Sequence, residues 1–271
     1  MKYGFYTPNF DFFGDATVLA ELAAEAEVAG WDGFFIWDHL QFIEPVADPW
    51  IALTAMALRT KSIRLGPLVT PVPRRHIGKL AREVLTLDRL SNGRLTLGVG
   101  AGYPHLPDYV SFGDSGDQRD RAARFDEALG LLDELCSGKP VQHNGAHYRV
   151  ETGAFASGIQ RPRVPIWVAA TWPAKRPLVR AARWDGIVAS GAYGLEVEPA
   201  AIAEIAAHVR RERPDEPVDI LRFGRTENPS DTSVVGACAA AGATWWIEYA
   251  PPAGSSLAEV RSRIALGPPR I

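Results

Sequence analysis

A chain of 271 residues can form one large domain or two small ones, and parallel α/β barrels of about 250 residues routinely form one. Its hydrophobic share of 46% and charged share of 23% are typical of a folded protein with a sizeable core. A formal net charge of -3, with acidic and basic residues interspersed, argues against a nucleic-acid-binding protein.

Along the chain, short apolar runs without helical period alternate with segments in which apolar residues recur every three to four positions. The runs that predict strands are 2–8, 34–38, 63–70, 95–100, 166–169, 186–190, 218–223 and 245–248. The segments that predict helices are 15–30, 49–60, 77–87, 119–135, 177–183, 199–211, 233–241 and 257–264. Asp15 and Asp48 are N-cap residues by type and place, and Gly30 is a typical helix stop.

Eight strand-helix units favour a closed parallel (β/α)8 barrel, because doubly wound sheets usually stop at five to seven strands. The rhythm lapses between residues 138 and 165, where Asn144-Gly145 predicts a β-hairpin outside the barrel, between the fourth and fifth strands. The turn between His143 and His147 argues against a metal site there, and we expect no metal. Residues 1–271 are therefore predicted to form one (β/α)8 (TIM) barrel domain.

Localisation signals are sparse. The chain begins almost at once with a strand, so we expect no signal peptide, and no apolar run approaches the roughly 18 residues of a membrane span. Cys136 and Cys238 both lie in apolar helical patterns, which favours buried thiols over a disulfide. We expect a cytoplasmic protein without membrane contact.

In such a barrel the chemistry lies where each strand runs into its following loop. Asp38-His39 follows the second strand and can hold a polar ring or move a proton, or can cap the loop locally. Pro67 lies in the third strand, which must therefore bend or bulge, either toward a ligand or simply to close the barrel. Arg74-Arg75-His76 fits either an attractor for anionic substrates or a surface helix start.

The next two loops are rich in small residues. Residues 98–102 after the fourth strand let a flat ligand approach the backbone, or form a tight turn, and their spacing is not that of a dinucleotide fingerprint. Residues 169–176 after the fifth strand fit a phosphate seat to which Lys175 and Arg176 add charge, or a solvated helix start. The tandem Trp245-Trp246 places one ring inside the barrel and one against the helices.

These residues, in this order, resemble the luciferase-like family of flavin-dependent barrel enzymes. The resemblance covers most of the chain up to about residue 191 and fades afterwards. It is carried by Gly30-Trp31-Asp32-Gly33, Trp37-Asp38-His39-Leu40, Ile63-Arg64-Leu65-Gly66, Val69-Thr70-Pro71, Leu87-Asp88-Arg89-Leu90-Ser91-Asn92-Gly93-Arg94-Leu95, Gly98-Val99-Gly100-Ala101-Gly102, Pro165-Ile166-Trp167-Val168-Ala169-Ala170 and Ala181-Ala182-Arg183-Trp184-Asp185-Gly186.

The resemblance implies flavin mononucleotide (FMN) or the deazaflavin coenzyme F420 at the barrel mouth, and Asp38-His39 favours F420. His39 is then the proton-handling group and Asp38 a positioning group. In many members the third-strand bulge holds a non-prolyl cis peptide. With Pro67 at the bulge here, the alternatives are a cis bond before Pro67 or none. The residues implied at the cofactor are Pro67, Leu68, Gly100, Ala101, Ala169, Ala170, Thr171, Trp172 and Ser190.

Function follows as a prediction from this resemblance. We expect an oxidoreductase or monooxygenase that transfers hydride between the cofactor and a small organic substrate, with Tyr103 and Tyr193 near the substrate. Some dehydrogenases of the family carry a glutamate as proton donor at the position of Tyr103, and this departure leaves open a barrel that binds cofactor without catalysis. A homodimer is expected from the family.

Overall fold

The computed structural model describes residues 1–42, 44–103, 108–192, 194–250 and 254–271. The barrel strands are β1 (Lys2–Thr7), β2 (Gly33–Ile36), β3 (Arg64–Pro67), β4 (Thr70–Pro71), β5 (Leu97–Gly100), β8 (Ile166–Trp172), β9 (Gly186–Gly191), β10 (Asp219–Gly224) and β11 (Trp245–Tyr249). The helices are α1 (Ala16–Val28), α2 (Pro49–Arg59), α3 (Ile77–Leu90), α4 (Gln118–Cys136), α5 (Lys175–Ala181), α6 (Pro199–Glu212), α7 (Ser233–Ala241) and α8 (Leu257–Ala265). None of these helices is long and apolar enough to cross a membrane.

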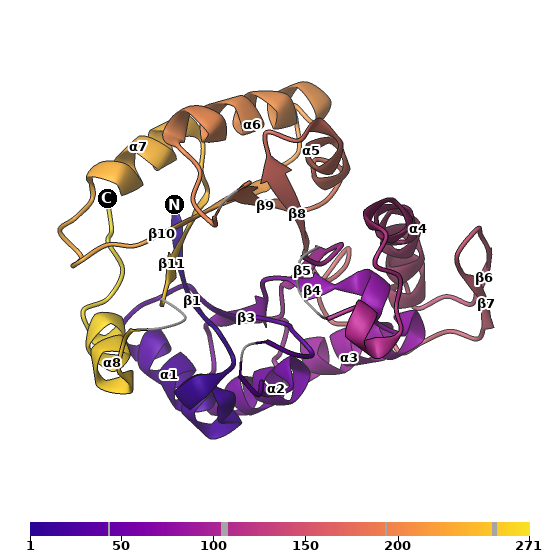
Figure 1. Cartoon of the computed structure of the whole chain (residues 1–271), viewed down its shortest axis with the longest axis horizontal. Helices are drawn as coiled ribbons and strands as arrows, with labels where there is room; N and C mark the ends of the chain where they lie inside the picture. The colour runs from indigo at the N-terminus through magenta and orange to yellow at the C-terminus, as the bar shows by residue number, and fades with distance from the viewer. Residues whose placement is uncertain (43, 104–107, 193, 251–253) are drawn as a thin grey trace.

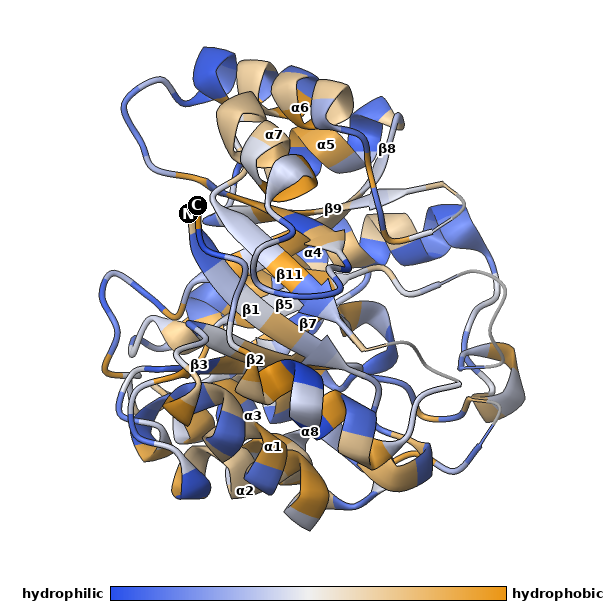
Figure 2. Ribbon diagram, turned by 90° about the vertical axis from the view of Figure 1, so that its left-hand side faces the viewer, coloured by the Kyte–Doolittle hydropathy of each residue, from blue (hydrophilic) through white to orange (hydrophobic). Residues whose placement is uncertain are grey.

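The strands form one parallel sheet in the order β3-β2-β1-β11-β10-β9-β8-β5-β4, and the helices surround it (Figure 1). The Leu65 amide donates to Arg94 O (3.0 Å) and the Thr96 amide donates to Leu65 O (2.9 Å), so β3 also meets the segment before β5. Seen from the side, α1, α2 and α3 lie on one flank of the strands and α5, α6 and α7 on the other (Figure 2). The predicted (β/α)8 barrel is confirmed.

The third barrel strand is broken rather than continuous. The prediction of one strand over 63–70 is wrong in this respect, because β3 ends at Pro67 and β4 begins at Thr70. Proline has no amide hydrogen to continue the ladder, so the predicted bend near Pro67 is confirmed. The cis peptide joins Leu68 to Val69, so neither alternative for its place, before Pro67 or absent, is correct.

Two apolar cores hold the barrel together. The smaller lies inside the strands and includes Trp245, and the larger lies between strands and helices and includes Trp246. The opposite placement of these neighbours confirms the sequence prediction, since adjacent strand residues point to opposite faces. Trp245 packs edge-on against Trp167, at 5.1 Å between ring centroids, and fills the barrel interior.

Capping residues and a glycine mark the ends of several helices, as the sequence predicted. Asp15 accepts a hydrogen bond from the Thr17 amide (2.7 Å), Asp48 accepts from Trp50, and Gly30 follows α1 with φ of +84°. The predicted helix 177–183 begins two residues earlier, at Lys175, because a proline in the first helical turn has no hydrogen bond to lose.

The predicted excursion between the fourth and fifth barrel strands is confirmed as the antiparallel pair β6 (Val141–Asn144) and β7 (Arg149–Thr152). This hairpin packs on α4, where His143 Nε2 lies 3.0 Å from Glu127 Oε1. The hairpin therefore belongs to the outer layer, away from the strand ends that form the barrel mouth (Figure 1).

A stability test follows from Glu27, which joins α1 to the start of β3. Burial acts to raise its pKa, but hydrogen bonds from Ser62, Ile63 and Lys61 lower it to about 2. Since this pKa lies below the ordinary value of 4.5, the carboxylate stabilises the fold above pH 4.5, and this contribution disappears as the pH falls toward 2. We predict that Glu27→Gln lowers the free energy of unfolding by about 1 kcal/mol at pH 7, with solvent screening allowed for.

Urea unfolding at pH 7 and near pH 2 measures this difference. The exposed control Glu204→Gln should change stability by less than about 0.5 kcal/mol at pH 7. An equal loss for Glu27→Gln at both pH values would contradict the assignment.

Candidate active site at the barrel mouth

A pocket of about 400 Å³ opens at the carboxyl ends of the barrel strands. It collects residues from the ends of β2, β5, β8 and β9 and from the break between β3 and β4. The predicted site residues that line it are Asp38, His39, Leu68, Gly100, Ala101, Tyr103, Ala169, Thr171 and Ser190.

Three predicted residues do not line the pocket, and a fourth lies outside the described residues. Ala170 and Trp172 alternate with Ala169 and Thr171 along β8, so they face the outer core instead. Pro67 precedes the inward-facing Leu68, and its carbonyl oxygen lies against Gly98. The side chains of these three residues therefore do not line the pocket, and their predicted contact with a cofactor stays a prediction. Tyr193 falls in a part of the chain that the structure does not describe.

One wall of the pocket is apolar backbone and side chain at the strand break. Leu68 and Val69 form it, and Tyr6 lies behind them. The Tyr6 hydroxyl donates a hydrogen bond to Leu68 O at 2.6 Å. Burial raises the pKa of Tyr6, which keeps the phenol protonated as the donor that holds this wall.

His39 is held at the edge of the pocket by a carboxylate. Its Nδ1 lies 2.7 Å from Asp108 Oδ2, and Asp108 Oδ1 accepts from the amides of Leu40 (3.1 Å) and Gln41 (3.0 Å). Burial acts to raise the pKa of Asp108, but the hydrogen bonds from His39 and Gln41 and the nearby Arg74 hold it below its usual range. An ionised Asp108 accepts from Nδ1–H, which leaves Nε2 as the ring nitrogen that can exchange a proton with a ligand.

Behind this pair lies a network of buried charges. Arg74 contacts Asp38 Oδ1 at 2.5 Å and Asp108 Oδ2 at 2.7 Å, and its side chain is 1% exposed. Arg75 adds contacts to both oxygens of Asp38 (2.7 and 2.8 Å), and the Thr70 hydroxyl donates to Asp38 at 2.7 Å. With both oxygens so engaged, Asp38 positions the loop and is not available to move a proton.

The two alternatives for Arg74-Arg75-His76 come out differently along the segment. His76 is exposed and is the N-cap of α3, which confirms a helix start on the surface at that residue. Arg74 departs from both alternatives, because its guanidinium is buried against two carboxylates.

Asp108 is a candidate functional residue that no sequence pattern indicated, and the role of Arg74 as a buried counter-ion was not predicted. Asp108 follows β5 in a segment without helical or strand periodicity. Its role becomes visible only from the residues that the fold brings next to it, His39 and Arg74.

Another wall of the pocket is formed by the segment that follows β5. The Tyr109 hydroxyl donates to Ala101 O at 2.8 Å, and Gly102 has φ of +83°. A Cβ on Gly102 would lie 2.4 Å from the Tyr109 hydroxyl oxygen, so only glycine fits. The side chain of Tyr103, 58% exposed, reaches the rim of the pocket. The close turn predicted for these glycines is thus part of the pocket wall.

A sequence model described as the luciferase-like monooxygenase family matches residues 5–226, and the chain belongs to this family. An F420-dependent glucose-6-phosphate dehydrogenase of Nakamurella multipartita is 35% identical over 200 residues, which cover 70% of this chain and 55% of that protein. A second enzyme of that name, from Beutenbergia cavernae, is 34% identical over 201 residues, 71% of this chain and 57% of its own. The chain thus spans little more than half the length of these curated relatives.

Solved structures agree on the fold. The coenzyme F420-dependent tetrahydromethanopterin reductase of Methanopyrus kandleri superposes with a TM-score of 0.76 at 17% identity and covers 98% of this chain and 96% of its own. The monooxygenase RslO1 of Streptomyces bottropensis gives 0.79 at 22% identity, with 98% and 97% covered. At these identities the likeness shows the barrel alone.

The buried charges give a second stability test. Arg74→Met leaves Asp38 and Asp108 without their shared cation, and we predict a loss of about 3–5 kcal/mol in the free energy of unfolding. The control Lys79→Met removes a cation that is 69% exposed and should cost no more than about 1 kcal/mol. Urea unfolding measures both, and similar values for the two variants would mean that Arg74 is not an essential counter-ion.

Proposed function

We propose that this protein is an F420-dependent oxidoreductase that transfers hydride between the deazaflavin and a small organic alcohol or carbonyl compound. The observation that carries the proposal is His39, held by Asp108 at 2.7 Å beside an apolar-walled pocket at the barrel mouth. Relatives named as F420-dependent enzymes, 35% and 34% identical over about 200 residues, support the same cofactor.

The residues present fit a flat, partly polar ring. Leu68 and Val69 offer an apolar surface, and the small residues Gly100, Ala101 and Ala169 in the lining leave room beside it. A volume of about 400 Å³ lies within the usual range of small-molecule sites. Thr171 and Ser190 add hydroxyl groups that can orient the polar edge of a bound ring or its side chain.

The bound deazaflavin supplies the centre that accepts or donates hydride. In oxidation of an alcohol, His39 Nε2 would take the hydroxyl proton while the bound coenzyme would supply the hydride acceptor, so that the product is a carbonyl compound. Asp108 keeps Nδ1 protonated throughout and stabilises the imidazolium that results. The reverse reaction returns the proton from Nε2 to the carbonyl oxygen, so one group serves both directions.

Substrate contacts are proposed for the aromatic residues at the rim. Tyr103 lines the pocket at the position where some relatives carry a glutamate, so the proton must move through His39 and not through that carboxylate. Tyr193, which lies outside the described residues, is proposed beside it from the sequence alone.

Thiols at Cys136 and at the buried Cys238, both unpaired, support a cytoplasmic location for the protein.

The replacement of the glutamate by Tyr103 favours a second candidate, in which the barrel binds FMN as a monooxygenase or binds cofactor without catalysis. Titration of the purified apo-protein with F420 and with FMN, followed by fluorescence, separates these cases. We expect micromolar binding of F420 and much weaker binding of FMN. Preference for FMN would support the monooxygenase, and binding without multiple turnover would support the non-catalytic barrel.

The role of His39 has its own test. We predict that His39→Ala lowers kcat by about 10²–10⁴ while F420 binding changes little, because the proton transfer is lost but the walls remain. Asp108→Asn should also lower kcat, with KM little changed, since the ring loses its orienting carboxylate. The control His147→Ala lies in the turn of the β6–β7 hairpin, away from the pocket, and should keep full turnover. Unchanged kcat in His39→Ala would remove this residue from the reaction.

We also propose a homodimer, supported by apolar side chains exposed on neighbouring helices. On α2, Ile51 is 68% and Leu58 is 69% exposed, and Val28 at the end of α1 is 90% exposed. Clustered exposed apolar groups are typical of protein interfaces. We predict that Ile51→Glu with Leu58→Glu converts the dimer to a monomer in size-exclusion chromatography with light scattering. A wild-type protein that is monomeric at micromolar concentration would overturn the proposal.

A further inference from the structure

The loop between β5 and α4 is closed by a buried tyrosine. The Tyr109 hydroxyl donates to Ala101 O at 2.8 Å, and its side chain is almost fully buried. The Tyr109 carbonyl oxygen accepts from the amides of Phe112 and Asp114, both at 3.0 Å, so its backbone and its ring are both held in place. The hydrogen bond of the hydroxyl spans eight residues, and it joins a residue that lines the pocket to the neighbour of Asp108.

An arginine of α4 lies over the ring of this tyrosine. The guanidinium carbon of Arg121 is 4.4 Å from the centroid of the Tyr109 ring, and Arg121 is 3% exposed. Among the residues that the structure describes, no carboxylate pairs with Arg121, and its Nε has no hydrogen-bond partner. A buried charge without a counter-ion is costly, so the face of the aromatic ring is the contact that compensates it.

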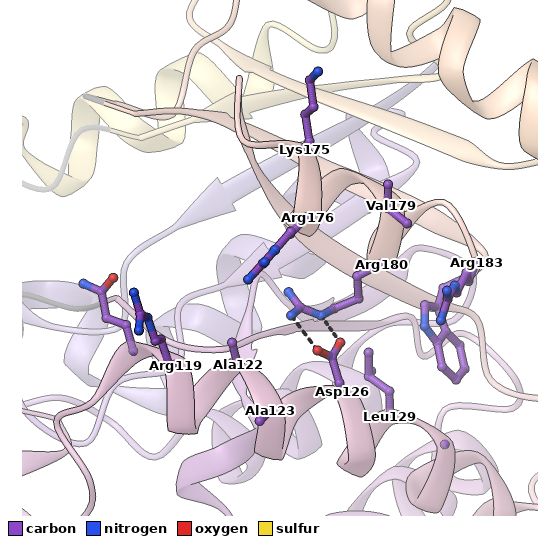
Figure 3. Close-up of a pocket in the computed structure, with 13 residues that line it drawn as sticks. Arg119, Ala122, Ala123, Asp126, Leu129, Lys175, Arg176, Val179, Arg180 and Arg183 are labelled. Atoms are coloured by element: carbon purple, nitrogen blue, oxygen red, sulfur yellow. Dashed lines mark hydrogen bonds and ion pairs between the residues drawn. The ribbon is translucent and has the colours of Figure 1, made fainter.

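The orientation of α4 separates this arginine from the groove between α4 and α5. That groove, of about 910 Å³, is lined by basic residues of both helices, and Asp126 of α4 is bonded to Arg180 of α5 across it (Figure 3). Arg121 instead shares a face of α4 with Phe125, which lines the barrel-mouth pocket, because residues four apart lie on one side of a helix. Arg121 therefore reaches the loop from the pocket side of α4.

Asp108, which orients His39, directly precedes Tyr109 in the chain. Arg74 contacts Asp108 at 2.7 Å, and Arg121 lies against the next residue, so two buried arginines fix consecutive positions of the loop. A shift of the Tyr109 ring would move the Asp108 carboxylate and change the direction of His39 Nε2. Such geometry tolerates little change, because a displacement of about 1 Å can lower a rate by about a hundred-fold.

We propose that Tyr109 and Arg121 are positioning residues of the candidate site, which together fix the carboxylate that orients His39. The inference rests on the proposed function, since it concerns the same proton-handling pair. Neither side chain lines the pocket. Both therefore act through Asp108, and their loss should lower kcat more than it lowers the affinity for ligands.

The variant Tyr109→Phe removes only the hydroxyl that closes the loop. We expect kcat to fall about ten-fold or more, with KM and the affinity for F420 little changed, because orientation and not binding is lost. In an Asp108→Asn background the same change should alter kcat by less than about two-fold, since residues in one chain of contacts are not additive. A tyrosine with a purely structural role would lower kcat by the same factor in both backgrounds.

Two arginine variants test the contact on the ring. Arg121→Met keeps the length of the side chain without its charge and should lower kcat about as much as Tyr109→Phe does. Arg121→Lys returns a cation to the ring and should recover part of that loss. One matched control is Arg82→Met, which removes a guanidinium 4.1 Å from the Phe155 ring, away from the pocket. The other is Tyr148→Phe on the β6–β7 hairpin, and both controls should keep full turnover.

Proton NMR of the apo-protein gives a readout that needs no turnover. The Nδ1 proton between His39 and Asp108 should give a downfield resonance, assigned by its absence in His39→Ala. This resonance should weaken or disappear in Tyr109→Phe and Arg121→Met, because a looser hydrogen bond lets the proton exchange with water. It should persist in both control variants.

The outcomes separate this inference from the proposed function. A full resonance in Tyr109→Phe, or equal losses of kcat in the two backgrounds, would overturn the inference. If the wild-type protein does not turn over with F420 and the resonance still depends on Tyr109 and Arg121, the proposed function fails and the positioning role stands. Should Tyr109→Phe not fold, the same measurements on Arg121→Met and Arg121→Lys decide.

Discussion

The candidate site depends on the ion pairs that the buried Arg74 guanidinium forms with two carboxylates. The guanidinium joins Asp38, at the end of β2, to Asp108, in the loop after β5. Both carboxylates are almost fully buried, and buried charges persist only where opposite charges and hydrogen bonds compensate them. Asp108 in turn fixes His39, so the stability of the network and the orientation of the ring cannot be separated.

The interrupted third barrel strand, β3 and β4, both closes the barrel and shapes the pocket. A Cβ on Gly66 would lie 1.9 Å from Thr96 O, so closure of β3 against the segment before β5 requires glycine. Directly afterwards the strand breaks, and Leu68 and Val69 turn toward the pocket. The interrupted strand thus makes the contact that closes the barrel and supplies the apolar wall against which a flat ring can lie.

The pocket at the barrel mouth adjoins a second cavity of different chemistry. The pocket beside His39 is small and largely apolar, whereas the groove between α4 and α5 is wide and basic. Arg180 lies at their junction. The net charge of -3 gave no sign of this, because net charge averages over a surface on which like charges are gathered locally.

By itself the sequence determined the features that depend on local pattern: the alternation that builds the barrel, the cap at Asp48, the hairpin, and the placing of His39 at a strand end. The pairing of His39 with Asp108, 69 residues away, was decided by the tertiary structure, as was the burial of Arg74. Periodicity and capping act over a few residues and leave a trace in the sequence. Contacts between distant loops depend on strand order and loop path, which no local pattern records.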